Sequence, residues 1–544
     1  MTLALLDTAG PAAPSALGSL LARALPLAQG AARLAGDLGR VAVGTDALMP
    51  ETRDRRFTDP AWTGNPLFRR LAQCHVALGQ TLDRAVDGLA AEGVDWRTLE
   101  RARFAATVAT SLLSPTNSLL TNPVALKAAL DTGGASVLRG LGRALEDLRS
   151  NGGLPSQTDR NAFTVGEHLA VTPGVVVHRD EVAEIIAYTP TTPQVHARPL
   201  LVVPPPIGRY YFLDLRPGRS FVEHAVAQGL QVFLVSWRNP GPEHADWDLD
   251  TYCARVLSAV DVVLDLTGAP DLNTLGFCAG GILQTLALNH LAQTGKASRV
   301  ASASYGVTLL DFDVPAPLGA FSFAPLLSLA GQGVSRKGVL GAKTLGALFA
   351  FMRPDELVFN YLVEGWLLGK PPPVFDILAW SVDGTNLPAA LHRQFVDLFA
   401  HNTLVRPSAL RVLGSPLDLS RITVPTFVTG ALTDHLTPWA GCYRTTQLLG
   451  GESTFVLSSS GHIASLVNPP GNPRARYYEG GSPDSDASTW KAEAAERTGT
   501  WWTAWAAWVT PRSGSLQDAV DPAERFPVLE AAPGSYVVDR AAGS

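Results

Sequence analysis

Cysteine is scarce in this sequence, and its spacing excludes two common uses of the residue. The 544 residues include four cysteines, Cys74, Cys253, Cys278 and Cys442, which lie far apart and form no Cys-x-x-Cys pair. Small secreted proteins carry dense cysteine frameworks, and zinc ribbons carry closely spaced pairs. The sequence therefore predicts neither a disulfide scaffold nor a metal site, and a reducing cytosol fits it best.

An excess of positive charge is also missing. The formal net charge is −6, and no block of like charges marks a binding tail. Proteins that bind nucleic acids usually present a basic patch or stripe to the phosphate backbone. We therefore expect no nucleic-acid partner.

Signals for export and for membrane insertion are weak or absent. The first residues, Met1–Asp7, lack the basic region that opens a signal peptide. One uncharged stretch, Val314–Ser335, is long enough to suggest a span, but Pro315, Pro317 and Pro325 interrupt it. We expect no transmembrane segment and interpret this stretch as part of an apolar lid.

The composition that remains is that of a large globular protein with two domains. Hydrophobic residues make up 46% of the chain and charged residues 17%, which is enough for a substantial core in each domain. Residues 60–150 show helical periodicity, and the polar, turn-rich run Ser150–Gln157 follows them. We predict a mainly helical N-terminal domain over residues 1–155, with roughly the first 40 residues flexible.

The second half of the chain has the rhythm of a parallel sheet. Short apolar runs alternate with helical ones at Leu200–Pro204, Ser220–Gln228, Val232–Ser236, Thr251–Thr267 and Leu272–Phe277, and a further strand is expected near Arg299–Leu310. The rhythm is then lost until Val424–Val428 and Thr454–Leu457. The sequence predicts a catalytic α/β domain over residues 156–544, with a lid inserted at about 313–415.

Cys278 lies at the predicted turn between the strand Leu272–Phe277 and a helix over Gly280–Gln293. Small residues stand two positions before it and two after it, at Gly276 and Gly280, as a nucleophile elbow of the α/β-hydrolase fold requires. The helix N-terminus would direct its dipole at the sulfur, and the Ala279 N–H could hold an oxyanion. The alternative is a buried structural cysteine.

An acid and a histidine follow Cys278 in the order that this fold uses. Asp434 comes just after an apolar strand and His462 lies in a glycine-flanked loop after the next strand. The alternatives are a solvated loop aspartate and a surface histidine. His435 is the main rival of His462, but its adjacency to Asp434 suggests a supporting role.

A second oxyanion donor is expected in the loop Pro204–Gly208, which follows the early strand. Proline has no N–H, so the donor must be Ile207 or Gly208. A merely rigid turn is the alternative.

A cysteine nucleophile suits a thioester substrate. A thiolate that attacks a thioester exchanges one thioester for another at nearly equal free energy, so the acyl group stays activated. The enzyme-bound thioester can then pass its acyl group to a hydroxyl, provided that water is kept away. An acyl-CoA donor fits this chemistry.

With these residues the chain resembles the polyhydroxyalkanoate synthases, and more the single-component long-chain types than the two-subunit kind. The similarity covers most of the chain. In the first half it is carried by Arg56–Trp62, Asn65–Phe68, Ser114–Asn117, Thr121–Pro123 and Thr132–Ser136. In the second half it is carried by His196–Pro205, Leu213–Pro217, Phe233–Pro240, Gly276–Cys278, Met352–Asp355, Asn360–Tyr361, Leu368–Lys370, Pro388–His392, Asp434–Trp439 and Ser460–Ala464.

The resemblance implies a catalytic triad and a substrate. Cys278 would carry the growing polyester, His462 would deprotonate it, and Asp434 would either support His462 or activate the incoming 3-hydroxyl. The substrates would be (R)-3-hydroxyacyl-CoA units, with no cofactor. The resemblance also implies a homodimer in the cytoplasm that associates with the surface of storage granules.

The chain departs from the family at two positions. Gly208 stands where an asparagine is usual in the early loop, and Ile282 stands where a threonine is common after the double glycine. Both departures lie beside expected catalytic groups, so we expect them to affect rate or substrate size.

Two other functions compete with the synthase. A cysteine hydrolase of the same fold would act as a thioesterase or a polyester depolymerase. A granule-coating protein would use the apolar N-terminus and Trp501, Trp502, Trp505 and Trp508 as surface anchors. For these tryptophans we favour the interpretation that they form part of a helical core.

Overall fold

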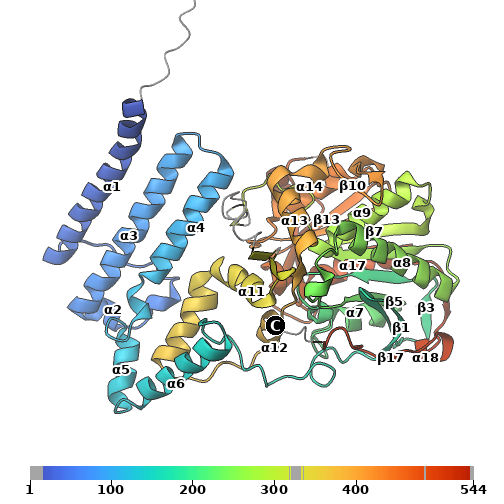
Figure 1. Ribbon diagram of the computed structural model, residues 1–544, viewed down its shortest axis with the longest axis horizontal. Coiled ribbons are helices and arrows are strands. Elements are labelled where there is room, and N and C mark those ends of the chain that lie inside the picture. Colours follow the sequence, from blue (N-terminus) through green and yellow to red (C-terminus); the bar gives the residue numbers. More distant parts are fainter. Residues whose placement is uncertain (1–15, 318, 320–332, 335, 483–484, 540–544) are drawn as a thin grey trace, which may run out of the picture. The chain divides into compact units, whose positions relative to one another are not determined.

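The computed structural model describes residues 16–317, 319, 333–334, 336–482 and 485–539, with side chains from residue 29 onward. It forms two compact units (Figure 1), one of Met1–Arg149 with Arg353–Lys370 and one of Ser150–Met352 with Pro371–Ser544. Residues 1–15 and much of the stretch Val314–Ser335 lie outside the described residues. The flexibility predicted for roughly the first 40 residues and the lid predicted for Val314–Ser335 therefore stay predictions.

The first unit is helical, as predicted. Its α-helices are α1 (Ala16–Val43), α2 (Ala61–Gly64), α3 (Pro66–Ala91), α4 (Trp96–Leu112), α5 (Pro123–Asp131) and α6 (Ala135–Ser150). Asn65 and Asn122 accept hydrogen bonds from the first backbone N–H groups of α3 and α5, and a proline opens each of these two helices. Phe57, Trp62 and Phe68 form the aromatic centre of a small core.

A segment from the predicted lid insertion belongs to this helical unit. Two π-helical turns, Asp355–Phe359 and Leu362–Leu367, lie in it. Arg56 pairs with Asp355 at 2.7 Å, and Trp366 Nε1 donates to Asp147 Oδ2 at 2.7 Å. A methyl group on Gly140 would lie 1.9 Å from the Trp366 carbonyl oxygen, so only glycine permits this approach. Residues 353–370 are therefore part of the helical unit's own packing.

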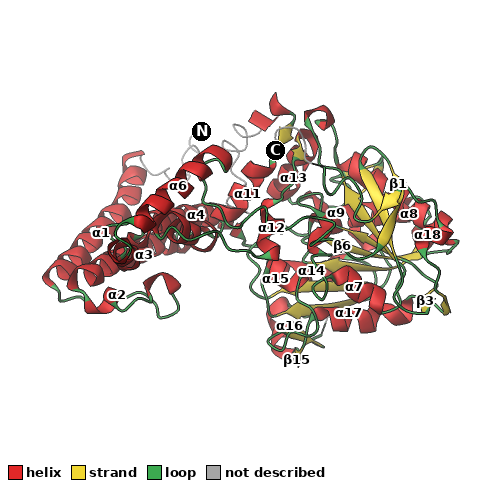
Figure 2. Ribbon diagram, turned by 90° about the horizontal axis from the view of Figure 1, so that it is seen from below, coloured by secondary structure: helices red, strands yellow, loops and turns green. Residues whose placement is uncertain are grey.

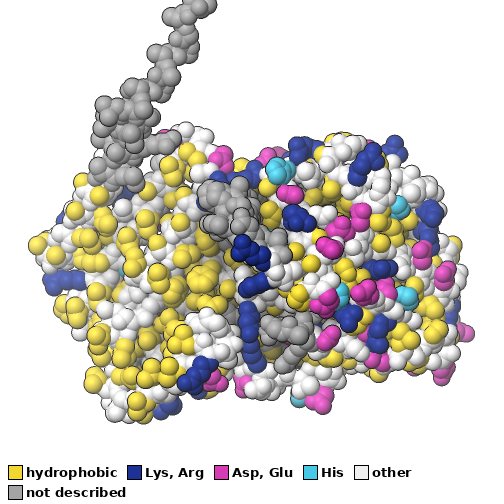
Figure 3. Space-filling model, viewed as in Figure 1, with side chains coloured by type: hydrophobic (Ala, Val, Ile, Leu, Met, Phe, Trp, Pro, Cys, Tyr) yellow, Lys and Arg dark blue, Asp and Glu magenta, His cyan; other side chains and the backbone are white. Residues whose placement is uncertain are grey.

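Large apolar side chains are exposed on the helical unit. Figure 3 shows hydrophobic atoms gathered over it. Twelve of the twenty exposed large hydrophobic side chains among the described residues belong to this unit, namely Leu38, Val43, Leu67, Leu112, Leu113, Leu120, Val124, Leu130, Leu138, Leu141, Leu145 and Leu148. Exposed apolar surface of this kind is typical of a site that contacts another apolar surface.

The second unit is built on an eleven-stranded sheet. Its spatial order is β15-β14-β13-β12-β7-β6-β4-β5-β2-β1-β17. The six central strands are parallel, and they are β4 (Leu200–Val203), β5 (Val232–Trp237), β6 (Leu272–Phe277), β7 (Val300–Gly306), β12 (Thr426–Ala431) and β13 (Ser453–Ser458). Each of these confirms a strand predicted from the sequence.

Antiparallel strands flank the parallel core. On one side they are β1 (Gly174–Arg179), β2 (Ala183–Tyr188) and β17 (Glu530–Ala531), and on the other β14 (Arg476–Glu479) and β15 (Ala495–Thr498). Short strand pairs lie outside the sheet: β3 (Gln194–His196) with β16 (Leu516–Asp518), β8 (Val339–Leu340) with β9 (Leu387–Pro388), and β10 (Arg411–Val412) with β11 (Ser415–Pro416).

Helices cover both faces of the sheet (Figure 2). Successive residues of β4 alternate between two hydrophobic clusters, because side chains along a strand point to opposite faces. One cluster includes α8 (Leu249–Thr267), α9 (Ala279–Gln293) and α14 (Trp439–Leu448), and the other includes α7 (Phe221–Ala227), α15 (His462–Leu466) and α17 (Trp501–Val509). Two further short helices of this unit are α16 (Ala487–Glu493) and α18 (Pro522–Arg525).

The tryptophans near residue 500 belong to the core, as predicted. Trp501, Trp502 and Trp505 on α17 are fully buried, and Phe221 contacts all three rings. Trp508 is half-buried against the same cluster. These side chains are therefore not available as surface anchors for a granule coat.

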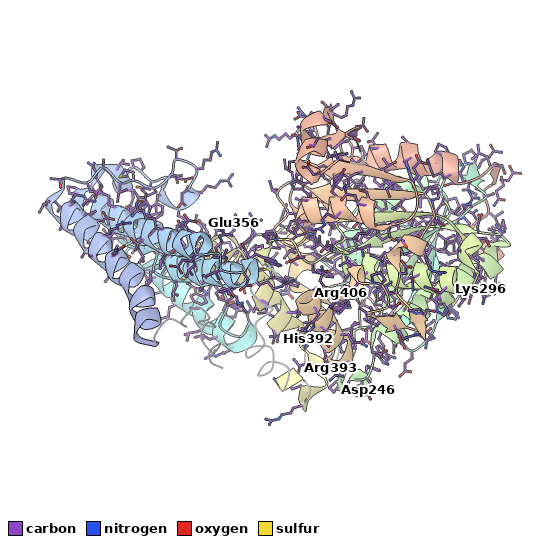
Figure 4. The ribbon with its side chains drawn as sticks, turned by 90° about the horizontal axis from the view of Figure 1, so that it is seen from above. Asp246, Lys296, Glu356, His392, Arg393 and Arg406 are labelled. Atoms are coloured by element: carbon purple, nitrogen blue, oxygen red, sulfur yellow. The ribbon has the colours of Figure 1, made fainter. Side chains whose placement is uncertain are left out.

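Among the described residues of the inserted region between β7 and β12, the helices α11 (Ala342–Phe351), α12 (Asp376–Val382) and α13 (Ala389–His401) belong to the second unit. His392 and Arg393, labelled in Figure 4, mark α13. Asp376, at the start of α12, is buried and forms ion pairs with Arg216 and Arg219. These ion pairs connect the start of α12 to the loop before α7. In the part of the chain that the structure describes, no helix is long and apolar enough to cross a membrane.

Candidate active site

Cys278 occupies a strained turn between β6 and α9. Its φ of 47° and ψ of −122° lie in a region that non-glycine residues rarely adopt. The Cys278 N–H donates to the Gly306 carbonyl at 2.9 Å, and its own carbonyl accepts from Gly281 N at 3.0 Å and Thr308 Oγ1 at 3.2 Å. These bonds hold the turn so that the half-exposed thiol stands at the N-terminus of α9, next to Ala279 N–H.

The glycines around Cys278 are required by close backbone contacts. A methyl group on Gly280 would lie 2.3 Å from the Val203 carbonyl oxygen, and one on Gly276 would lie 2.6 Å from the Cα of Gly281. A methyl group on Gly281 would lie 2.2 Å from Thr308 Oγ1. The elbow thus packs directly against the end of β4, where the predicted oxyanion loop begins.

Gly280→Ala is therefore expected to destabilise the catalytic unit by about 2 kcal/mol or more, because the new methyl overlaps backbone that cannot move cheaply. Chemical denaturation would measure the change. Gly346→Ala is the matched control, since Gly346 lies inside α11 with open space around it and should gain about 0.5 kcal/mol. Equal stability of the two variants would contradict the packing described for the elbow.

His462 and Asp434 meet beside Cys278. Asp434 follows β12 and His462 opens α15 after β13, so the two neighbouring parallel strands deliver both side chains to one edge of the sheet. His462 Nδ1 lies 2.7 Å from Asp434 Oδ2, and the Cys278 side chain is near enough to the His462 ring to raise its pKa. The three residues predicted from chain order are thus brought together.

The surroundings of Asp434 hold its carboxylate in place. Its Oδ1 accepts the backbone N–H groups of Leu436 and Thr437 at 2.8 and 2.9 Å, and its Oδ2 accepts the Thr437 hydroxyl at 2.8 Å. Burial raises the pKa of Asp434, but the His462 ring and the bonds from Thr437 outweigh burial and lower it below the ordinary value of 3.8. Asp434 is therefore an anion.

His462 is shifted in the opposite direction. Burial lowers its pKa, but the Asp434 carboxylate and the nearby Cys278 side chain outweigh this effect and raise it to about 10. At neutral pH the imidazole therefore holds a proton between a carboxylate and a sulfur. This arrangement can stabilise a thiolate and later return the proton to a leaving group.

Two further side chains lie near this group. Half-buried His435 follows Asp434 in the same loop. Cys442 on α14 is fully buried and donates to the Thr437 carbonyl at 3.6 Å, and burial raises its pKa well above the ordinary value of 9.0. A buried neutral thiol is a poor nucleophile, so Cys442 is a weaker candidate for the nucleophile than the half-exposed Cys278.

The loop after β4 narrows the choice of the second oxyanion donor. Gly208 N–H donates to the Thr385 hydroxyl at 2.8 Å. The Gly208 N–H is thus already engaged, and Ile207 and Ala279 stay predictions as oxyanion donors. Sequence reasoning did not find Thr385 or Thr437, although the place of Thr437, three residues after Asp434 in a turn, is a usable signal.

The backbone explains one of the two departures from the family pattern. Gly208 has a φ of +87°. Glycine adopts this left-handed region without steric strain, and asparagine is the best-tolerated alternative. Both residues therefore suit the turn. Ile282 is buried in the hydrophobic cluster around α9, where it adds apolar packing.

Grouped metal ligands are not seen among the described residues: no three His, Cys, Asp or Glu side chains lie close enough together to hold an ion.

Comparisons with known proteins agree with the resemblance. Residues 53–225 match the family model for the N-terminus of poly-beta-hydroxybutyrate polymerase (PhaC), and residues 214–469 match that of the alpha/beta hydrolase fold. The poly(3-hydroxyalkanoate) polymerase 2 of Ectopseudomonas oleovorans is 42% identical over 93% of this chain and 90% of its own. The poly(3-hydroxyalkanoate) polymerase subunit of Cupriavidus necator is 39% identical over 90% of this chain and 83% of its own.

A solved structure, carboxylesterase CesB from Bacillus subtilis, is similar to 61% of this chain over 93% of its own, at 13% identity and a TM-score of 0.32. These two polymerase matches cover at least 90% of this chain and at least 83% of each relative. The chain therefore belongs to the poly(3-hydroxyalkanoate) polymerase family.

Proposed function

We propose that this protein is a polyhydroxyalkanoate synthase, an acyltransferase that polymerises (R)-3-hydroxyacyl-CoA and releases CoA through a thioester on Cys278. The observation that carries the proposal is the strained Cys278, beside a buried and hydrogen-bonded His462–Asp434 pair, in a chain of the polymerase family. A cysteine in this position loads an acyl group from a thioester reversibly.

In the loading step, the Cys278 thiolate attacks the carbonyl carbon of the acyl-CoA. A bond forms between that carbon and Sγ, and the bond to the CoA sulfur breaks. The proton held by His462 passes to the departing CoA thiolate. The oxyanion formed between these events is stabilised by the N–H groups of Ala279 and Ile207.

In the transfer step, a 3-hydroxyl attacks an acyl-thioester. His462, which gave up its proton in loading, now takes the hydroxyl proton, and Cys278 leaves as the thiolate. The product is an oxygen ester, which lies downhill from a thioester, so the chain grows irreversibly.

We further propose that Asp434 supports His462 and does not itself deprotonate the hydroxyl. Its side chain has no exposed surface, and both oxygens are already engaged by Leu436, Thr437 and His462. A carboxylate in this setting orients the imidazole and stabilises its charged form.

A cysteine hydrolase of the same fold is the second candidate, and the acceptor distinguishes the two. Purified protein incubated with (R)-3-hydroxybutyryl-CoA is expected to release CoA and precipitate polyester. Release of free 3-hydroxy acid without polymer would instead establish the hydrolase.

We also propose that the enzyme works as a homodimer at the granule surface in the cytoplasm. Dimerisation has support from family membership alone. Surface association has support from the exposed leucines of the helical unit, of which Leu138, Leu141, Leu145 and Leu148 fall on one side of α6.

Replacing Leu138, Leu141 and Leu148 together by glutamine is expected to weaken binding to polyester particles about tenfold, because apolar area on α6 no longer leaves water. Co-sedimentation with preformed particles would measure the change. Val528, Leu529 and Leu516, which are also exposed but lie on the second unit, are the control set. Equal losses in the two sets would argue against a surface on α6.

A further inference from the structure

The loop after β4 has few hydrogen bonds of its own. Pro204, Pro205 and Pro206 lack N–H groups, so three successive positions cannot donate. The indole N–H of Trp237 holds the Pro204 carbonyl at 2.9 Å, at the start of the loop. The shape of the rest, from Pro206 to Gly208, therefore depends on side chains from other parts of the unit.

Thr385 forms hydrogen bonds with the loop on both sides of Ile207. Its hydroxyl donates to the Pro206 carbonyl at 3.3 Å and accepts the Gly208 N–H at 2.8 Å. Thr385 is buried, so water does not compete for these bonds. The hydroxyl group thus donates a hydrogen bond to the peptide before Ile207 and accepts one from the peptide after it.

These bonds set the direction of the Ile207 N–H. The Pro206 carbonyl and the Ile207 N–H belong to the same planar trans peptide, in which the two groups point in opposite directions. Because Thr385 holds the carbonyl, the Ile207 N–H must point away from Thr385. The second bond fixes the next peptide, so the Ile207 residue cannot turn freely.

The loop lies against the elbow. β4 and β6 are neighbouring parallel strands, with Val203 opposite Gly276. The carbonyl oxygens of Val203 and Pro204 are so close to Gly280 that a methyl group there would lie 2.3 and 2.5 Å from them. A small rotation of the loop would therefore change the position of its N–H groups relative to Cys278.

The segment that carries Thr385 is itself tied to the residues after the loop. Trp380 Nε1 donates to the Arg209 carbonyl at 2.7 Å, and Asp383 pairs with the buried Arg209 guanidinium at 3.0 Å and accepts the Tyr211 hydroxyl at 2.9 Å. Residues 380–385, which end and follow α12, thus hold the loop from Pro206 to Tyr211 as a clamp.

We infer that Thr385 is a positioning residue for the reaction: it orients the Ile207 N–H that stabilises the oxyanion of the acyl-thioester. This inference rests on the proposed function, since it needs an oxyanion at Cys278. The inference gives a residue of the inserted region a role in the reaction. It also means that the position of the Ile207 N–H depends on the segment that follows α12.

Thr385→Val, which keeps the shape and removes the hydroxyl, is expected to lower kcat for CoA release about 10- to 100-fold with KM changed less than about threefold. Thr385→Ser is expected to restore kcat to within about threefold of the wild type. Alkylation of Cys278 by iodoacetamide forms no oxyanion, so its rate should stay within about twofold in Thr385→Val.

Thr267→Val is the matched control. The Thr267 hydroxyl also donates to a carbonyl, that of Val263 at 2.7 Å, and accepts an N–H, that of Ala269 at 3.3 Å. It stands at the end of α8, before β6 begins, and so at the opposite end of the strands from Cys278. This variant should keep the wild-type kcat.

Three results would overturn the inference: a Thr385→Val kcat within about twofold of the wild type, equal losses of kcat and alkylation rate, or no rescue by serine. If Thr385→Val does not fold, Thr385→Ala is measured in the same way. Cys278→Ala keeps the two proposals apart, because CoA release by that variant would refute the proposed function itself, whatever Thr385 does.

Discussion

Cys278→Ala is expected to abolish CoA release from (R)-3-hydroxybutyryl-CoA, with a loss of about 10⁴-fold or more. The variant lacks the sulfur that accepts the acyl group, and the fully buried Cys442 cannot replace it because burial keeps that thiol neutral. A continuous assay of free CoA thiol would measure the rate. Polymer formation should be lost to the same extent.

Cys74→Ala is the control for this experiment. Cys74 lies on α3 of the helical unit and, like Cys278, is half-exposed, whereas the other two cysteines are buried. Its loss should leave CoA release unchanged. If Cys278→Ala kept a rate near that of Cys74→Ala, the acyl carrier would have to be another group.

Asp434→Asn is expected to lower kcat by about 10²- to 10⁴-fold, because the amide keeps the shape of the carboxylate but no longer stabilises the His462 imidazolium. Asp486→Asn is a close control. Asp486 also accepts two backbone N–H groups on Oδ1 and a threonine hydroxyl on Oδ2, but it caps the surface helix α16. Equal activity of the two variants would exclude Asp434 from the mechanism.

The same substitution has a signature in the pH dependence of stability. The pKa of His462 is raised from 6.5 to about 10 on folding, so its contribution is full below pH 6.5 and is lost as the pH rises toward 10. The pKa of Asp434 is lowered from 3.8, so its contribution is present above pH 3.8 and is lost as the pH falls through the folded value.

The free energy of unfolding of the wild type should therefore exceed that of Asp434→Asn most between pH 3.8 and 6.5. Denaturation curves over this range and up to pH 10 would test the window. A difference that grew from pH 6.5 to 10 would contradict the charged pair.

The catalytic sheet was predictable because its parallel strands are buried on both faces and read as apolar runs. β4, β5, β6, β7, β12 and β13 all fall where such runs occur. The first two strands, β1 and β2, were not predicted, although β2 is fully buried. They pair antiparallel at the flank and follow a long irregular segment, so no βαβ rhythm marks them.

The residues that meet at Cys278 were predictable from chain order, since neighbouring parallel strands end at the same edge of the sheet. Asp434 and His462 follow β12 and β13, which pair in register. Thr385 was not predictable in this way. It reaches Pro206 and Gly208 across nearly 180 residues from a segment without regular structure, and sequence periodicity carries no information on such contacts.

The sequence likewise did not predict that residues 353–370, from the second half of the chain, belong to the helical unit. Arg56 and Asp355 are about 300 positions apart, and their ion pair depends on the fold of the helical unit. The sequence shows here only a loss of strand rhythm, which is compatible with a simple insertion.

Mass spectrometry of the protein after brief incubation with (R)-3-hydroxybutyryl-CoA would show whether Cys278 carries the acyl chain. The peptide containing Cys278 is expected to gain a ladder of 3-hydroxyacyl units, which neutral hydroxylamine removes and which Cys278→Ala lacks. Polymer accumulation with Cys278 unmodified, or a single acyl group that is released only as free acid, would contradict this expectation.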